Sequence, residues 1–145
     1  MSNPEPTAAQ REPYLRLVRA SAWYDLAVTA GFATPWTYAL VHAALNAGDA
    51  LGLGAFPEME VAQVLYANLM GSVVVVWSLL RLLRTERVHG LYDGAARVLF
   101  TTWMAYALAH GGPELLWPFL IVEACWGAVQ LVPWLRRRGR VAARC

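Results

Sequence analysis

The sequence lacks lysine altogether, and charged residues make up only 15% of its 145 positions. An average soluble domain carries about 25% charged residues. Hydrophobic residues account for 58% of the chain and gather in long blocks, leaving too few positions for a separate soluble catalytic domain. The formal net charge is only +2, and the arginines gather at the edges of the apolar blocks. This distribution excludes a nucleic-acid-binding protein.

Cysteine and histidine are also scarce. Cys125 lies inside an apolar run and Cys145 is the last residue, so the two form neither a CxxC motif nor a metal-ligand spacing. The three histidines, His42, His89 and His110, lie in three different segments. We therefore expect no disulfide framework, no metal site and no cofactor.

The hydrophobic residues form four stretches, which indicates an all-α integral membrane protein. Residues 61–83, 91–109 and 115–134 are each long enough, at about 1.5 Å per helical residue, to cross a hydrocarbon core of about 30 Å. Their length and the absence of turn signals favour spanning helices over strands. We expect a bundle of four transmembrane helices.

The first stretch, residues 20–46, is interrupted by Thr34-Pro35. Threonine followed by proline is also the N-cap and first-position pattern of a new helix. The first span is therefore either one long helix kinked at Pro35, or a span followed by an interfacial helix over residues 36–49. Trp36 and Tyr38 would suit such an interface.

The arginines indicate the orientation of the helices. They precede the first stretch and follow the second and fourth, whereas the remaining connections carry acidic residues and no arginine. The positive-inside rule then places both termini in the cytoplasm of a bacterial-type inner membrane. We expect a flexible cytoplasmic tail at 1–13, a transmembrane domain at 14–135, and a basic cytoplasmic tail at 136–145 that contacts anionic lipid headgroups.

Charged residues inside the spans need an explanation, because each costs about 2.5–3.5 kcal/mol to insert. Asp25 and Asp93 each lie six residues beyond an arginine at a span edge, and Arg97 lies one turn after Asp93. Two acids can satisfy one buried guanidinium group. We expect Asp25, Asp93 and Arg97 to form a structural charge cluster that holds the first span against the third.

Glu123 is the candidate functional residue. It lies near the middle of the fourth span, and no arginine is expected at its depth, so Asn68 of the second span is its expected partner. A protonated Glu123 bonded to Asn68 would be purely structural. Alternatively, Glu123 would carry a proton, act as a catalytic acid, or bind a polar lipid head. The expected ligand pocket is lined by Asn68, Trp77, Trp103, Glu123, Trp126 and Gln130.

No motif in the sequence identifies a known family. The composition favours a small multi-pass inner-membrane protein, acting as an accessory subunit or as a binder of a hydrophobic, lipid-like ligand. One alternative is a membrane enzyme that acts on an isoprenoid or lipid, with Glu123 as acid or base. A second alternative is a small proton-coupled transporter. The expected partners are membrane lipids, a hydrophobic small molecule, and either further copies of this chain or a larger membrane complex.

Overall fold

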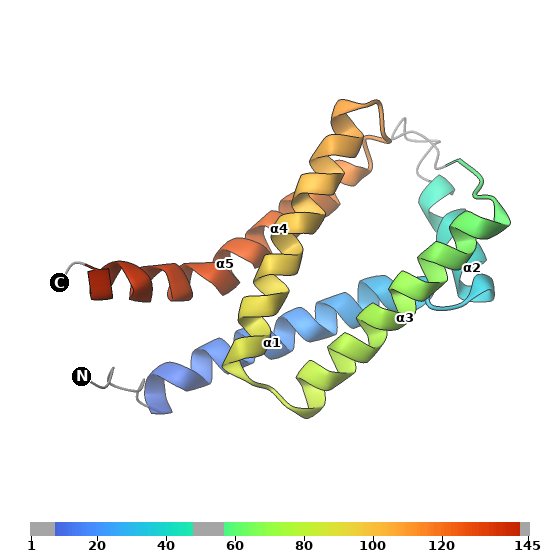
Figure 1. The fold of residues 1–145 in the computed structure, drawn as a ribbon. Coiled ribbons are helices and arrows are strands. Elements are labelled where there is room, and N and C mark those ends of the chain that lie inside the picture. The colour runs from blue at the N-terminus through green and yellow to red at the C-terminus, as the bar shows by residue number, and fades with distance from the viewer. Residues whose placement is uncertain (1–7, 48–56, 143–145) are drawn as a thin grey trace.

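The computed structural model describes residues 8–47 and 57–142, and within these ranges the chain is helical, with no strand. This confirms the expected all-α class. Five α-helices and one short 3₁₀ helix follow one another along the chain (Figure 1). They are α1 (Ala8–Thr29), η1 (Ala30–Phe32), α2 (Pro35–Asn46), α3 (Val61–Leu83), α4 (Arg87–Ala109) and α5 (Leu116–Ala142).

The helix bounds differ from expectation mainly at the start of α1 and at the end of α5. Residues 8–13 form the start of α1, although the sequence suggested a flexible tail over 1–13. The segment 8–11 is made of good helix formers. Pro13 lies in the second turn of α1, where it has no N–H to donate to the carbonyl oxygen of residue 9. Helix α3 has the expected bounds, α4 begins four residues early, and α5 continues eight residues beyond residue 134.

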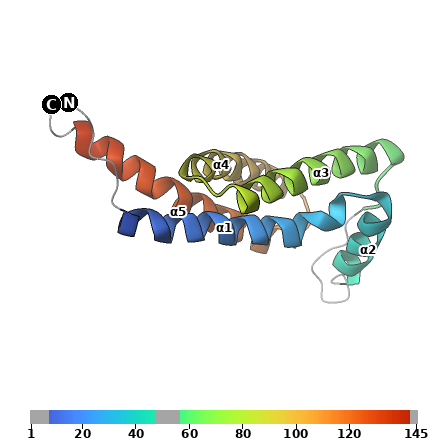
Figure 2. The same ribbon diagram turned by 90° about the horizontal axis from the view of Figure 1, so that it is seen from below.

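The chain breaks between α1 and α2, which excludes one long kinked helix over residues 20–46. Thr34 is extended, with φ −137° and ψ 154°, and its hydroxyl accepts a hydrogen bond from the Thr37 N–H at 3.2 Å. Pro35 occupies the first helical position, where its missing N–H costs nothing. Helix α2 is therefore a separate helix, and its axis turns away from that of α1 (Figure 2).

The long helices pack as two pairs. Helix α1 lies along α3, and α4 lies along α5, while contacts between the pairs are fewer. Figure 1 shows the two pairs meeting near the middle of α1 and diverging toward the ends that carry α2 and the α4–α5 turn. Gly111 in that turn has φ +84°, a left-handed conformation that glycine adopts without strain. The start of α1 and the end of α5 lie on the same side (Figure 2).

The interior of the bundle is polar and its exterior is apolar. Fully buried side chains include Arg81, Arg97, Gln130, Ser21 and Ser78, whereas large hydrophobic side chains are exposed along α3, α4 and α5 and at Trp23 of α1. Soluble proteins show the opposite distribution, because charged residues are rarely buried in them. The chain therefore presents an apolar surface to its surroundings.

Two of the described helices are long and apolar enough to cross a membrane. They are α3, with mean hydropathy 1.6, and residues Leu116–Arg136 of α5, with mean hydropathy 1.4. Only 11% of each segment is buried, whereas the core helix of a soluble protein would be mostly buried. Helices α1 and α4 do not reach this hydropathy within the part of the chain that the structure describes.

Candidate functional site: a buried charge cluster beside an apolar groove

Two arginines lie at the centre of the bundle. Arg81 of α3 has no exposed surface, and Arg97 of α4 is 2% exposed. Nη2 of Arg81 donates to Oδ2 of Asp25 in α1, and Nη1 of Arg81 lies 2.7 Å from Oδ2 of Asp93 in α4. Arg81 therefore joins three of the four long helices.

Arg97 binds three acids. Its Nη2 donates to Asp25 Oδ1 at 2.6 Å, its Nε donates to Asp93 Oδ2 at 3.3 Å, and its Nη1 donates to Glu123 Oε2 at 2.5 Å. Asp93 and Arg97 lie one turn apart on one helix face, which accounts for their contact. We call Asp25, Arg81, Asp93, Arg97 and Glu123 the charge cluster.

Neutral polar side chains add hydrogen bonds to the charge cluster, although the buried Nε of Arg81 has no partner. The Ser21 hydroxyl donates to Asp93 Oδ2 at 2.7 Å and accepts from Arg97 Nη2 at 2.9 Å. Gln130 Nε2 donates to the same Asp93 oxygen at 2.6 Å, and Trp77 Nε1 donates to its Oδ1 at 3.2 Å. Both oxygens of Asp93 are thus occupied, as a buried carboxylate requires.

Aromatic rings cover the two guanidinium groups. Trp77 lies 5.4 Å from the Arg81 guanidinium carbon, while Tyr24 and Trp126 lie 5.6 and 5.8 Å from that of Arg97. Arginine is less strongly hydrated than lysine and stacks on aromatic faces, so it tolerates this environment. The Tyr24 side chain also interacts with the Glu123 carboxylate.

The structure brings Asp25, Asp93 and Arg97 together, and it adds two residues that sequence reasoning had placed elsewhere. Arg81 had been counted among the arginines at a membrane edge, but it is buried. Asn68 was the expected partner of Glu123 because no arginine was expected at its depth, but the Arg97 side chain reaches Glu123. The Glu123–Asn68 pairing was therefore wrong, because the long Arg97 side chain spans the difference in depth. The excess of acids over arginines inside the spans was the available signal for a second buried cation.

The six expected ligand-binding residues are distributed over the bundle rather than around one pocket. Asn68 Nδ2 donates to the Phe32 carbonyl oxygen at 2.8 Å, which ties α3 to η1. Trp103 is 63% exposed and contacts Tyr106. Of the six, only Glu123 lines the groove described in the next paragraph. Three more contact the charge cluster. These three are Trp77, Trp126 and Gln130.

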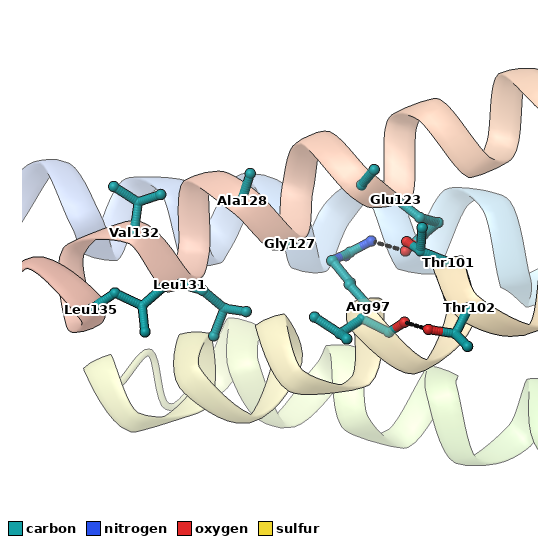
Figure 3. Close-up of a pocket in the computed structure, with 11 residues that line it drawn as sticks. Arg97, Thr101, Thr102, Glu123, Gly127, Ala128, Leu131, Val132 and Leu135 are labelled. Atoms are coloured by element: carbon teal, nitrogen blue, oxygen red, sulfur yellow. Dashed lines mark hydrogen bonds and ion pairs between the residues drawn. The ribbon is translucent and has the colours of Figure 1, made fainter. Parts of the chain in front are cut away.

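An open groove of about 300 Å³ lies between α4 and α5. Figure 3 shows Arg97, Thr101 and Glu123 toward one end of it and Leu135 at the other. The Thr101 Oγ1 atom is buried without a hydrogen-bond partner, although most buried polar atoms are paired. The remaining lining is apolar apart from Thr102, and it comprises Val98, Ala124, Gly127, Ala128, Leu131, Val132 and Leu135.

The described residues contain no group of three histidine, cysteine, aspartate or glutamate side chains able to hold a metal ion. Comparison of the chain with protein-family models, with curated proteins and with solved structures finds no match. Any functional conclusion therefore depends on the chemistry of the charge cluster and the groove.

Proposed function

We propose that this chain is a multi-pass membrane protein in which α1, α3, α4 and α5 all cross the bilayer. The apolar exterior and the buried charge cluster support this arrangement. Helix α4 is less hydrophobic than α3 because it carries Asp93 and Arg97, and α1 because it carries Asp25 and four charged residues up to Arg19. Asp25, Asp93 and Arg97 face one another rather than lipid. At about 1.5 Å per residue, the 23 residues of α4 are long enough for the hydrocarbon core. In α1 the residues beyond Arg19, continued by η1 to residue 32, extend about 20 Å, so this crossing is shorter than the others.

The exposed arginines support an orientation with both termini in the cytoplasm of an inner membrane. Arg19, in the middle of α1, is exposed and donates to Thr85 just beyond α3, where Arg84 is also exposed. Arg136 is exposed toward the end of α5. Trp36, 79% exposed, lies on α2 at the opposite end of the bundle. An amphipathic tryptophan suits the membrane–water interface, so α2 is proposed to lie at the outer surface.

We propose that the protein binds a hydrophobic, lipid-like ligand in the groove between α4 and α5, as an accessory protein of the membrane. The observation that carries this proposal is the groove itself, whose lining is apolar and whose end holds Glu123 and the unpartnered Thr101 hydroxyl. Ligand sites commonly combine apolar walls with a few placed polar groups. The groove opens toward the surroundings of the bundle, where a lipid-like molecule would enter from the bilayer.

Binding is preferred over the enzyme and transporter alternatives because it uses Glu123 as the structure shows it. An acid catalyst or a proton carrier must gain and lose a proton in each cycle. Here Arg97 Nη1 donates to the Glu123 carboxylate at 2.5 Å within a network that holds the bundle together. A binding role requires no rearrangement of that network.

Native mass spectrometry of the protein, extracted gently from its membrane, tests the proposal. We expect a co-purified molecule of defined mass on the wild-type chain. Ala128→Phe would place a large ring in the groove, so this variant should lose the bound mass. Val129→Phe is the matched control, because Val129 is the next residue, is 45% exposed, and does not line the groove.

Equal retention of the bound mass by Ala128→Phe and wild type would contradict the proposed site. Wild-type protein that carries no bound molecule, and takes up none from a lipid extract of its own membrane, would contradict the proposed binding function.

A further inference from the structure

The charge cluster contains more acids than bases. With all five groups ionised, the three carboxylates of Asp25, Asp93 and Glu123 face the two guanidinium groups of Arg81 and Arg97. One negative charge is left in excess among side chains that are at most 12% exposed. An unbalanced charge is costly in a poorly hydrated environment, and either protonation of a carboxylate or a positively charged partner removes that cost.

The excess charge is accessible at Glu123 rather than at the two aspartates. Both oxygens of Asp25 accept hydrogen bonds from arginines. The two oxygens of Asp93 accept hydrogen bonds from Trp77 and Gln130. Glu123 accepts from Arg97 on Oε2 and also interacts with Tyr24, and it is the one acid of the cluster that lines the groove, beside Arg97. A cation in the groove would therefore meet Glu123.

The Thr101 hydroxyl supplies a second contact at the same end of the groove. Its Oγ1 atom is buried and unpartnered, and as a hydroxyl it can donate one hydrogen bond and accept up to two. The neighbouring Thr102 hydroxyl instead donates to the Val98 carbonyl oxygen at 2.8 Å, so it already has a partner. A head group with two or more N–H donors would satisfy Glu123 and Thr101 together.

The rest of the groove fits one hydrocarbon chain. From Glu123 to Leu135 it follows twelve residues of α5, about 18 Å at 1.5 Å per residue. Small side chains at Ala124, Gly127 and Ala128 keep it open along that length.

We infer that the ligand of this groove is a single-chain amphiphile with a cationic primary-amine head, held by Glu123 and Thr101. This inference rests on the proposed binding function and specifies the chemistry of the ligand. A head with an alcohol would satisfy the hydrogen bonds but not the excess charge. A carboxylate head would add to the negative charge that is already in excess.

The test measures binding of three probes of equal saturated chain length, a primary amine, an alcohol and a carboxylic acid, to the full chain in detergent micelles. Probe binding in the groove is defined as the fraction of total probe binding that is lost in Ala128→Phe and retained in Val129→Phe. We expect the amine to bind about tenfold more tightly than the alcohol, as expected for a charge-assisted hydrogen bond. The acid should bind most weakly.

Two variants test the proposed contacts. Glu123→Gln should reduce amine binding to the level of the alcohol, because the amide carries no charge. Thr101→Val should weaken amine binding several-fold, whereas Thr102→Val should leave it unchanged. The threonine pair keeps the test decisive if Glu123→Gln does not fold.

Groove binding of all three probes with equal affinity, or an amine preference that survives Glu123→Gln, would overturn the inference while leaving the proposed binding function in place. If Ala128→Phe reduces the binding of none of the three probes, the proposed function itself is overturned.

Discussion

Arg81 and Arg84 lie one helical turn apart near the end of α3, yet their environments are opposite. Arg84 is exposed, whereas Arg81 is fully buried and contacts both Asp25 and Asp93. Removing one member of a buried ion pair leaves its partner charged and uncompensated, which lowers the stability strongly. Replacing the whole pair by well-packed apolar residues costs much less. The buried arginine is therefore essential to the bundle in a way that its neighbour is not.

We predict that Arg81→Met lowers the free energy of unfolding by about 3–5 kcal/mol, because two carboxylates lose a buried cation. Arg84→Met should change it by less than about 0.5 kcal/mol, as expected at an exposed position. Thermal unfolding of both variants in the same mild detergent measures the difference. Equal stability of the two variants would contradict the central role of Arg81.

At the scale of the elements, the contact between α3 and η1 depends on a glycine. A Cβ atom built on Gly71 would lie 2.6 Å from the Phe32 carbonyl carbon and 2.8 Å from the Ala33 nitrogen. These are backbone atoms, so a side chain at this position would push the whole turn away. The approach also allows Asn68 to reach the Phe32 carbonyl oxygen. Gly71 thus fixes where the chain turns from α1 into α2.

We predict that Gly71→Ala destabilises the protein by about 1–3 kcal/mol, the usual cost of overpacking. Ser72→Ala is the matched control at the next position, where the side chain is exposed and reaches only the Ala33 carbonyl oxygen at 3.5 Å. It should change stability by less than about 0.5 kcal/mol. Unfolding curves of the two variants against wild type measure both effects, and an unaffected Gly71→Ala would show that the turn shifts freely.

For the whole molecule, the distribution of polarity is the main property. Exposed leucine, valine and tryptophan side chains cover the long helices, while seven polar or charged residues are buried at their centre. In water this arrangement would expose large apolar patches, which soluble monomers rarely tolerate. In a bilayer it places hydrocarbon against hydrocarbon and keeps the charges paired.

The exposed thiol of Cys125 on α5 distinguishes the two environments. In a Cys145→Ser background, we predict that Cys125 in native membranes does not react with a membrane-impermeant maleimide, because hydrocarbon excludes both the reagent and the reactive thiolate. Unfolding in strong detergent should restore labelling. Rapid labelling of the folded protein in intact membranes would mean that this face of α5 contacts water.

Cysteines introduced at exposed positions of the cysteine-free chain test the orientation. Glu114→Cys should react with the impermeant reagent from outside intact cells, whereas Arg84→Cys should react only after the membrane is opened. The opposite pattern would reverse the proposed orientation, and equal labelling of both from one side would contradict the number of crossings.

The arrangement of the helices along the chain could be read from the sequence, because it depends on local properties. The length of the apolar stretches predicts the bounds of α3 and places α4 and α5 to within a few residues, apart from the extension of α5 beyond residue 134. The Thr34-Pro35 pair predicts a helix start, although it left open whether the first helix bends or ends. The N-terminal start of α1 was missed because residues 8–11 have helix propensity without hydrophobicity.

The candidate site could be predicted only in part. Asp93 and Arg97 lie on one helix face, so their contact follows from spacing alone. The partners of Arg81 and Glu123 depend instead on how far long side chains reach between helices, and no sequence pattern gives that distance. The same is true of the groove, which exists only where α4 and α5 lie side by side.

The sequence by itself therefore determined an all-helical chain with long apolar segments and charges inside them, because helix length and hydropathy are properties of neighbouring residues. Only the tertiary structure decided which charges meet, and it placed Arg81 inside rather than at an edge. It also decided that Asn68 holds η1 and that Glu123 lies between Arg97 and a groove. Polar contacts between the helices join residues as far as 120 positions apart, and they are set by the packing of whole helices.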